Sequence, residues 1–181
     1  ISFQQNQQRI AFDICPVNIV LNHYVNKLDL AYDDQGSIAV SGNLNHALLE
    51  QLNGLEFYNK QPPKSLSLEW VQENVYPLID QMEQDVPVIL NTFVEHTAIQ
   101  ISKVIFNNDS VLVTGGGVFN TYLMQRIQFY ASNQIDLVNE ELINFKEALV
   151  FSFLGLLKLR DEVNCLQSVT GASKNHSSGV V

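Results

Sequence analysis

The sharpest chemical feature of the sequence is a run of three glycines, Gly115 to Gly117, that follows the apolar segment Val111–Thr114. Glycines leave the backbone bare, so that it can take positive φ and approach a flat ligand closely. In open α/β sheets, ligands bind at the carboxyl ends of strands, and a following helix directs its free N–H groups to the same place. The run therefore predicts a ligand-binding turn between a strand and a helix.

The glycine run alone leaves several interpretations to weigh. A Walker-type phosphate loop is excluded, because no Lys-Ser or Lys-Thr pair follows the glycines. A dinucleotide fingerprint fits better, since Gly115 and Gly117 are correctly spaced and Asp136 lies nineteen residues beyond Gly117. However, Asn120 stands where that fingerprint needs its third glycine. The other interpretations are the adenosine loop of the actin, Hsp70 and hexokinase superfamily, and a tight turn that binds no ligand.

Two acidic residues lie in apolar surroundings. Asp13 falls inside the run Arg9–Cys15, which reads as a buried strand, and burying an unpaired carboxylate is costly. It either caps a helix that starts at Pro16 or serves as a general base at the end of the strand. Glu147 lies on an apolar helix, where a solvent-facing glutamate is the default. Cys15 is more typical of a small core thiol than of a nucleophile, because no histidine lies at a suitable position.

Hydrophobic periodicity predicts strands that alternate with helices. This alternation is typical of an α/β sheet covered by helices. A glycine-punctuated polar loop is expected over 33–42, and a break at Asn107-Asn108-Asp109. The expected strands cover 9–15, 110–114 and 134–138, and the expected helices cover 18–28, 45–52 (capped by Asn43 or Asn45), 67–82 (interrupted at Pro77), 85–106, 120–131 and 144–160.

Composition narrows the function classes. The 181 residues carry a net charge of −9, which repels the phosphate backbone of nucleic acids, so a nucleic-acid partner is not expected. No apolar run approaches the ~20 residues that cross a bilayer, and we expect a cytoplasmic protein. The two cysteines lack metal-binding spacing and the four histidines are scattered, so no protein-built metal site is expected. The chain begins at Ile1 rather than Met and reads as a piece of a longer protein.

Several motifs, taken together and in order, resemble the anhydro-N-acetylmuramic acid kinase family over about residues 9–172. The family carries Phe-Asp-Thr-Gly-Pro-Gly-Asn, Pro-Pro-Lys-Ser followed by an acid, Gly-Gly-Gly-x-x-Asn followed by Leu-Met, a Glu-Ala pair on a late apolar helix, and Val-Thr-Gly-Ala. The matching segments here are Phe12–Asn18, Pro62–Ser65 with Glu69, Gly115–Asn120 with Leu123-Met124, Glu147-Ala148 and Val169–Ala172.

The resemblance implies a two-lobed, actin-like ATPase fold of the ribonuclease H-like kind. Residues 1–181 would be its second, nucleotide-binding lobe, an α/β lobe with a mixed sheet and helices on both faces. The N-terminal lobe would be absent and the isolated chain inactive. The family cleaves the 1,6-anhydro ring of its amino sugar with water and phosphorylates O6 from ATP with Mg²⁺, in peptidoglycan recycling. A second copy of the chain is a candidate partner.

The resemblance also implies roles for individual residues. Asp13 would activate the water, Glu147 would position the sugar or that water, and Gly115, Gly116, Gly117 and Asn120 would line the adenosine site. Ile14, Cys15 and Val17 replace Thr, Gly and Gly of the family, in a loop expected near the phosphates. Two alternatives remain: an actin- or Hsp70-like nucleotide-gated binding module without sugar chemistry, and a nicotinamide-dependent dehydrogenase.

Overall fold

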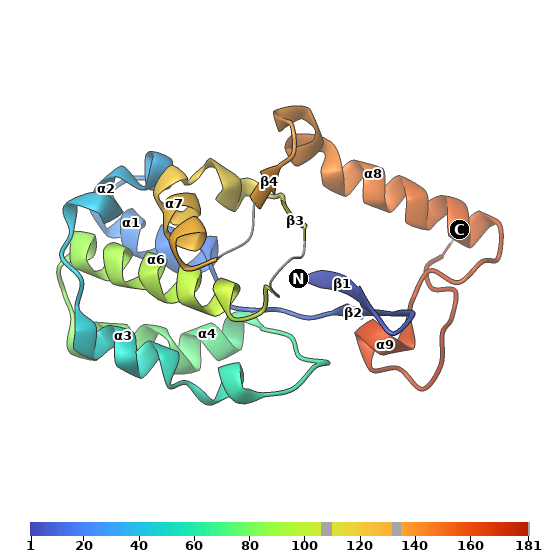
Figure 1. The fold of residues 1–181 in the computed structure, drawn as a ribbon, viewed down its shortest axis with the longest axis horizontal. Helices are drawn as coiled ribbons and strands as arrows, with labels where there is room; N and C mark the ends of the chain where they lie inside the picture. Colours follow the sequence, from blue (N-terminus) through green and yellow to red (C-terminus); the bar gives the residue numbers. More distant parts are fainter. Residues whose placement is uncertain (106–109, 132–134, 181) are drawn as a thin grey trace. The chain divides into compact units, whose positions relative to one another are not determined.

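A computed structural model describes residues 1–105, 110–131 and 135–180 of the chain (Figure 1). The chain divides into two compact units. The larger, which we call the helical unit, comprises Ile14–Asn59 and Leu66–Val138, and the smaller, which we call the hairpin unit, comprises Ile1–Asp13, Lys60–Ser65 and Asn139–Val181. Each unit is described by itself.

The helical unit is built around one central helix, α6 (Val86–Ser102), which packs against α1, α2, α3 and α7 (Figure 1). Twelve of its seventeen residues are buried, as expected of a helix that is apolar on most of its circumference. The other helical elements are α1 (Asn18–Val25), η1 (Asn26–Leu28), η2 (Asp34–Gly36), α2 (Ser37–Ser41), α3 (His46–Asn53), η3 (Glu56–Asn59), α4 (Leu68–Asn74), α5 (Tyr76–Met82), η4 (Gly116–Phe119) and α7 (Thr121–Tyr130).

Several of the polar groups buried on α6 are paired across the helical unit. Arg126 on α7 donates to both carboxylate oxygens of Glu95, at 2.6 and 2.8 Å. On the opposite flank, His96 contacts Asn53 and Tyr58 through its two ring nitrogens, each at 2.8 Å. A buried polar group is costly only when it lacks a partner, so these pairs allow a polar middle in an otherwise apolar helix.

Several expected elements of the helical unit are confirmed. Asn45 caps α3 by accepting from the Leu48 N–H at 3.0 Å. The segment 67–82 forms two helices, α4 and α5, with Pro77 in the first turn of the second. The helix expected over 85–106 ends at Ser102, and Phe106 and the break expected at 107–109 lie outside the described residues.

The loop expected over 33–42 is wrong, because these residues form η2 and α2. The carboxylate of Asp33 accepts the Ile38 N–H at 2.8 Å and the Ala39 N–H at 2.9 Å. These bonds satisfy N–H groups in the first turn of α2, which have no partner within the helix itself. A side chain placed upstream therefore stabilises a helix whose own residues show little periodicity.

The helical unit also contains a strand–helix–strand motif. Strands β3 (Val111–Val113) and β4 (Ile135–Leu137) pair in parallel, and α7 connects them. Both strands were expected, although Gln134, the expected first residue of the second, lies outside the described residues. The glycine run follows β3 after one residue, Thr114, at the place that the sequence predicts.

The hairpin unit contains β1 (Ser2–Gln5) and β2 (Gln8–Ala11), which pair antiparallel, followed by α8 (Glu140–Leu159) and α9 (Gln167–Thr170). Asn6 and Gln7 at the hairpin turn both have positive φ, 48° and 65°, as a two-residue primed turn requires. The buried strand expected over 9–15 is wrong: β2 ends at Ala11 and its residues are exposed or half-buried. Helix α8 starts four residues before the expected Asn144, because Asn139 caps it by accepting from Leu142 N–H.

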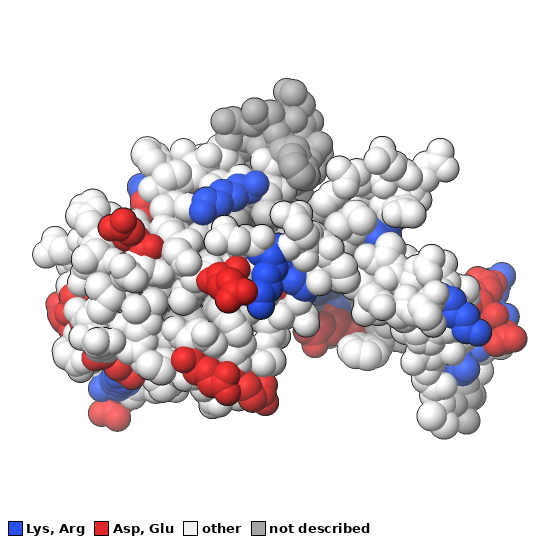
Figure 2. Space-filling model, turned by 90° about the horizontal axis from the view of Figure 1, so that it is seen from below, with Lys and Arg blue, Asp and Glu red and all other residues white. Residues whose placement is uncertain are grey.

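The structure confirms a mixed α/β class. It corrects the expectation of one mixed sheet, because the described strands form two separate two-stranded sheets, one in each unit. No helix among the described residues is long and apolar enough to span a membrane. On the face of the helical unit at the left of Figure 2, acidic residues form several separate groups, and Lys and Arg do not gather into a broad patch.

Candidate functional site

The glycine run after β3 has the backbone that the sequence predicts for a bare turn. Gly115 has a φ of +96°, which side chains other than glycine rarely allow. The chain then makes the short turn η4 before α7 begins, so the glycines do not lead straight into the helix. Asn120 caps α7 by accepting the Leu123 N–H at 2.9 Å, which fixes the end of the turn.

A cavity of about 460 Å³ opens beside this turn. Asn18, at the start of α1, lies against the glycines: a side chain at Gly116 would place its Cβ 3.6 Å from the Asn18 Nδ2. The cavity therefore joins two of the motifs that carried the family resemblance, Phe12–Asn18 and Gly115–Asn120. Its volume is within the range of small-molecule sites. The residues that line it are Asn18, Leu21, Asn22, Tyr32, Asp33, Asp34, Gln35, Gly116, Phe119 and Asn120.

The wall of the cavity formed by Tyr32 to Gln35, which Gly36 follows, was missed by the sequence analysis. Gly36 has a φ of +78°, and a Cβ there would lie 2.7 Å from the Tyr122 Cβ and closer still to the Asn120 Oδ1. Only glycine allows this loop to pack so tightly beside the cap of α7. The signal in the sequence was the acid–acid–x–glycine pattern of Asp33–Gly36, which indicates a turn with a left-handed residue rather than an open loop.

A second cluster of motifs lies in the hairpin unit, around Asp13. The Asp13 N–H donates to the Lys64 carbonyl at 3.1 Å, and the Lys64 ammonium lies 5.6 Å from the centre of the Phe12 ring. Partial burial lowers the pKa of Lys64. The segment Val169–Ala172 reaches the same place, since a Cβ at Gly171 would lie 3.6 Å from the Cγ of Pro63. Three motifs distant in sequence therefore meet next to Asp13.

Glu147, the other expected catalytic residue, lies on α8 with its side chain exposed. It belongs to the hairpin unit together with Asp13, whereas Gly115, Gly116, Gly117 and Asn120 belong to the helical unit. The roles expected for all six residues stay predictions.

Comparison with known proteins decides the family. A model of the family described as anhydro-N-acetylmuramic acid kinase matches residues 2–181. The chain belongs to this family. Proteins named anhydro-N-acetylmuramic acid kinase from Sulfurovum sp. and Psychrobacter cryohalolentis are 30% and 32% identical to it, over 95% and 98% of the chain. One from Aliivibrio fischeri is 29% identical over 98% of the chain. The chain spans about half the length of these relatives: 49%, 46% and 51%.

Membership of the anhydro-N-acetylmuramic acid kinase family agrees with how the structure places Asp136. A dinucleotide-binding site needs that acid near the glycine turn, at the carboxyl end of the strands. Instead, Asp136 accepts from the Ser110 hydroxyl at 3.4 Å, and Ser110 precedes β3 at the end opposite Gly115. The geometry thus disfavours the dehydrogenase alternative.

Cys15, within the family's Phe-Asp motif, is not an activated nucleophile. Burial raises the pKa of its thiol to about 12, so that the thiol is protonated at neutral pH. Only the thiolate is strongly nucleophilic. The prediction that Cys15 is not a nucleophile is therefore supported, whereas the residue is half-buried at the margin of the core and not within it.

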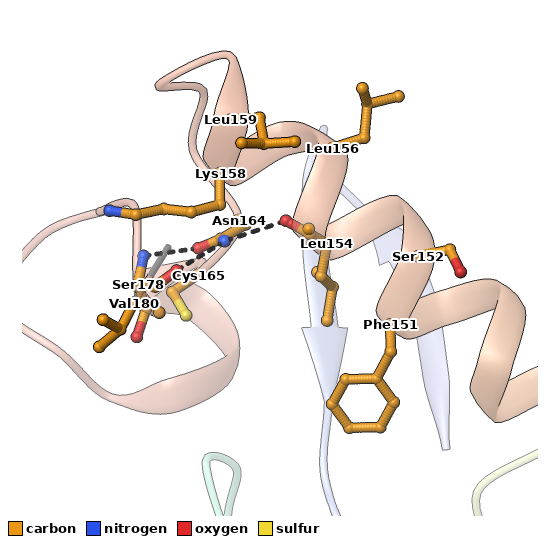
Figure 3. Close-up of a pocket in the computed structure, with 12 residues that line it drawn as sticks. Phe151, Ser152, Leu154, Leu156, Lys158, Leu159, Asn164, Cys165, Ser178 and Val180 are labelled. Carbon is orange, nitrogen blue, oxygen red and sulfur yellow. Dashed lines mark hydrogen bonds between the residues drawn. The ribbon is translucent and has the colours of Figure 1, made fainter.

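The hairpin unit contains a larger cavity, of about 700 Å³, beside α8 (Figure 3). Its lining is mainly apolar and includes Phe151, Leu154 and Val180. The side-chain amide of Asn164 is used by the backbone, because it donates to the Leu154 and Ser178 carbonyls at 3.4 and 2.9 Å and accepts the Ser178 N–H at 2.7 Å. This cavity is lined chiefly by apolar side chains, whereas Asn and Asp side chains line much of the cavity beside the glycine turn, as is typical of a site that orients a polar ligand.

Proposed function

We propose that the intact protein is an ATP-dependent kinase that opens the 1,6-anhydro ring of anhydro-N-acetylmuramic acid and phosphorylates its O6, a reaction of peptidoglycan recycling in the cytoplasm. The observation that supports this most is the cavity in which Asn18 meets the glycine turn and Asn120. In a chain of this family, such a bare, polar cavity is suited to the nucleoside of ATP.

We also propose that the 181 residues form the second lobe of a two-lobed, actin-like protein. The chain spans about half the length of its relatives, which leaves room for another lobe. Helix α8 supports the same proposal, because none of its twenty residues is buried. An apolar stripe runs along it, formed by side chains that are 38% to 70% exposed: Leu142, Phe145, Leu149, Phe153, Leu156 and Leu159.

The absent half of the protein is the occupant that we assign to this stripe. A helix that is apolar on most of its surface is stable in water only when a partner covers it. The stripe recurs at intervals of three or four residues over the full length of α8, which fits packing against other helices. The acidic residues Glu140 and Glu147 lie off the stripe, so that docking would not bury these two charges, and Glu141 lies one turn before Phe145 at the N-terminal end of the stripe.

In the proposed reaction, Asp13 accepts a proton from water as the water oxygen attacks the anomeric carbon C1. The C1–O6 bond breaks, O6 takes its electron pair and attacks the γ-phosphorus, and ADP leaves. The proton held by Asp13 passes to solvent. Glu147 holds the sugar or the water in line. Phosphoryl transfer depends on positioning and charge neutralisation, and general-base assistance contributes roughly 10²- to 10⁴-fold.

The residues present fit the nucleotide better than a preformed metal site. A Cβ at Gly116 would contact Asn18, and both residues line the cavity that the nucleoside would fill. Among the described residues, no group of three His, Cys, Asp or Glu could hold a metal ion. Mg²⁺ would therefore be held chiefly by the phosphates of ATP and by water, as is usual for this ion, and would neutralise charge on the transferred group.

The experiment is an assay of the full-length protein with Mg-ATP and the anhydro sugar in ¹⁸O-labelled water, read by mass spectrometry. We expect a 6-phosphorylated sugar that carries one ¹⁸O at C1 and none in the phosphate. Unreacted sugar, with ATP binding intact, would instead favour the alternative of an actin- or Hsp70-like nucleotide-gated module. Omission of ATP is the control.

A further inference from the structure

Two aromatic side chains line the cavity beside the glycine turn without being packed into the core. Tyr32 is 64% exposed and Phe119 is 48% exposed, and both contribute to the cavity wall. A large aromatic side chain usually stabilises a fold by being buried in its core. An exposed aromatic side chain in a concave site is instead typical of ligand contacts. The sequence analysis assigned no role to either.

Both rings are carried by backbone that is held in place. Tyr32 directly precedes Asp33, whose carboxylate is tied to the first turn of α2 at 2.8 and 2.9 Å. Phe119 lies in η4, where the Val118 and Asn120 N–H groups donate to the Gly115 and Gly117 carbonyls at 3.0 and 3.1 Å. Aromatic groups on fixed backbone lose little freedom when a flat ligand stacks on them.

The charge of the cavity indicates which part of a nucleotide it receives. Asp33 and Asp34 line it, and none of its lining residues is Lys or Arg. A phosphate group would be repelled here, whereas hydroxyl groups would be favoured because a carboxylate is a strong acceptor. The carboxylate of Asp34 is exposed and has no hydrogen-bond or ion-pair partner among the described residues, so it is available for such donors.

Two further polar groups face the cavity without a partner in the described part of the chain, the side-chain amides of Asn18 and Asn22. Each amide both donates and accepts, which matches the edge of a nucleobase. The side-chain oxygen of Asn120, by contrast, already accepts a hydrogen bond from the Leu123 N–H in the cap of α7.

We propose that Tyr32 and Phe119 hold the base of the nucleotide by stacking, and that Asp34 accepts hydrogen bonds from the ribose hydroxyls. This inference rests on the proposed function, and it assigns the cavity to the nucleoside, with the phosphates outside it. Tyr32, Asp34 and Phe119 are then determinants of nucleotide affinity that the motifs behind the family resemblance do not specify.

The experiment measures binding of Mg-ADP to the full-length protein by titration calorimetry. Tyr32→Leu and Phe119→Leu keep apolar bulk but remove the ring, and each should weaken binding by about 5- to 150-fold, the range of base–aromatic stacking. Phe129→Leu is the matched control, because Phe129 is an exposed aromatic on α7 outside the cavity and its loss should leave affinity unchanged.

A second arm separates the ribose contact from a structural effect. The unmodified protein should bind 2′,3′-dideoxy-ADP about tenfold more weakly than ADP. Asp34→Asn should reduce this difference in affinity between ADP and its dideoxy form, because the variant has no carboxylate to accept hydrogen bonds from the ribose hydroxyls of ADP.

The outcomes distinguish the two levels of the proposal. If the unmodified protein fails to bind Mg-ADP, the nucleotide site itself is refuted. If it binds Mg-ADP and the Tyr32 and Phe119 variants match the Phe129 control, only the stacking assignment is overturned. If Asp34→Asn keeps the full preference for ADP over the dideoxy form, the ribose assignment is overturned.

Discussion

The two units of the molecule differ in how they use their apolar residues. Among the described residues, every buried hydrophobic side chain lies in the helical unit, mostly on α1, α3, α5, α6 and α7. The hairpin unit has none, although α8 carries Phe145, Phe151 and Phe153 with more than half of their surface exposed. The helical unit thus has its own core, whereas the hairpin unit has an exposed apolar surface.

This difference also separates the two halves of the proposed chemistry. The cavity for the nucleoside is built by the unit with a complete core, which can hold it in shape without help. The motifs around Asp13, and Glu147 on α8, belong to the unit that lacks a core. We infer that nucleotide binding is a property of the helical unit, while turnover requires the intact protein.

The largest expected effect is the separation of turnover from binding. Asp13→Asn in the full-length protein should lower kcat by about 10²- to 10⁴-fold, because the amide cannot accept a proton from water. Affinity for Mg-ADP, measured by calorimetry, should change less than twofold. An Asp29→Asn variant, on the exposed end of η1, is the control. Equal loss of turnover and nucleotide affinity would contradict this division between the units.

The second prediction contrasts two phenylalanines. Phe93→Ala, in the core of the helical unit, should lower the free energy of unfolding by about 3–5 kcal/mol. Phe145→Ala, on α8, should change the free energy of unfolding of the 181-residue chain by less than about 0.5 kcal/mol. In the full-length protein, Phe145→Ala should cost about 1.5–3 kcal/mol, because the absent half would bury the ring. Urea unfolding measures all three, and a neutral effect of Phe145→Ala in the full-length protein would refute the docking of α8.

The sequence allowed prediction of those features that depend on local signals. The cap at Asn45, the break near Pro77, strand β3 and the bare turn at Gly115 each follow from neighbouring residues, and each is confirmed. The helix after Asp33 and the hairpin at Asn6 and Gln7 were not found, because one depends on a side chain reaching several residues forward and the other uses residues unusual at a primed turn.

The candidate site divides in the same way. The glycine turn was found from its composition, but the wall of Tyr32 to Gln35 was not. That wall is brought to the turn by packing between η2 and α7, which are more than eighty residues apart in sequence. The meeting of Pro63 with Gly171 beside Asp13 is likewise a contact between distant segments, for which spacing gives no signal.

The third prediction concerns that packed wall. Gly36→Ala should lower the free energy of unfolding by about 2–4 kcal/mol, since alanine resists positive φ and its Cβ would collide with Asn120 and Tyr122. It should also weaken Mg-ADP binding, because Asn120 and the loop line the same cavity. Gly155→Ala, on α8 with open space around it, is the matched control. Full stability and full affinity in Gly36→Ala would show that the loop relaxes without disturbing the site.

The smallest expected effect is a dependence of stability on pH that comes from the core of the helical unit. Asn53 Oδ1 only accepts, so the Nδ1 of His96 carries the proton, and Nε2 accepts from the Tyr58 hydroxyl. Burial, with a smaller contribution from the charge of Lys103, lowers the pKa of His96 to about 3. An unfolded histidine titrates near about 6.5. The stability contributed by neutral His96 is therefore complete above that value and is lost as the pH falls toward 3.

Between pH 6 and pH 5, His96 gains a proton in the unfolded chain but not in the folded one. Its contribution should lower the free energy of unfolding by about 1.4 kcal/mol for each pH unit where His96 of the unfolded chain is fully protonated, and by somewhat less near pH 6. Urea unfolding at a series of pH values measures the slope. His96→Gln should be less stable at pH 7 and should lack that slope, whereas His46→Gln, at an exposed position on α3, should retain it. Lys64 and the groups around Asp13 lie in the hairpin unit, outside this core, so Lys64→Gln should also retain the slope. A slope that persists in His96→Gln would show that another group titrates, and would refute the prediction that His96 causes the pH dependence of stability.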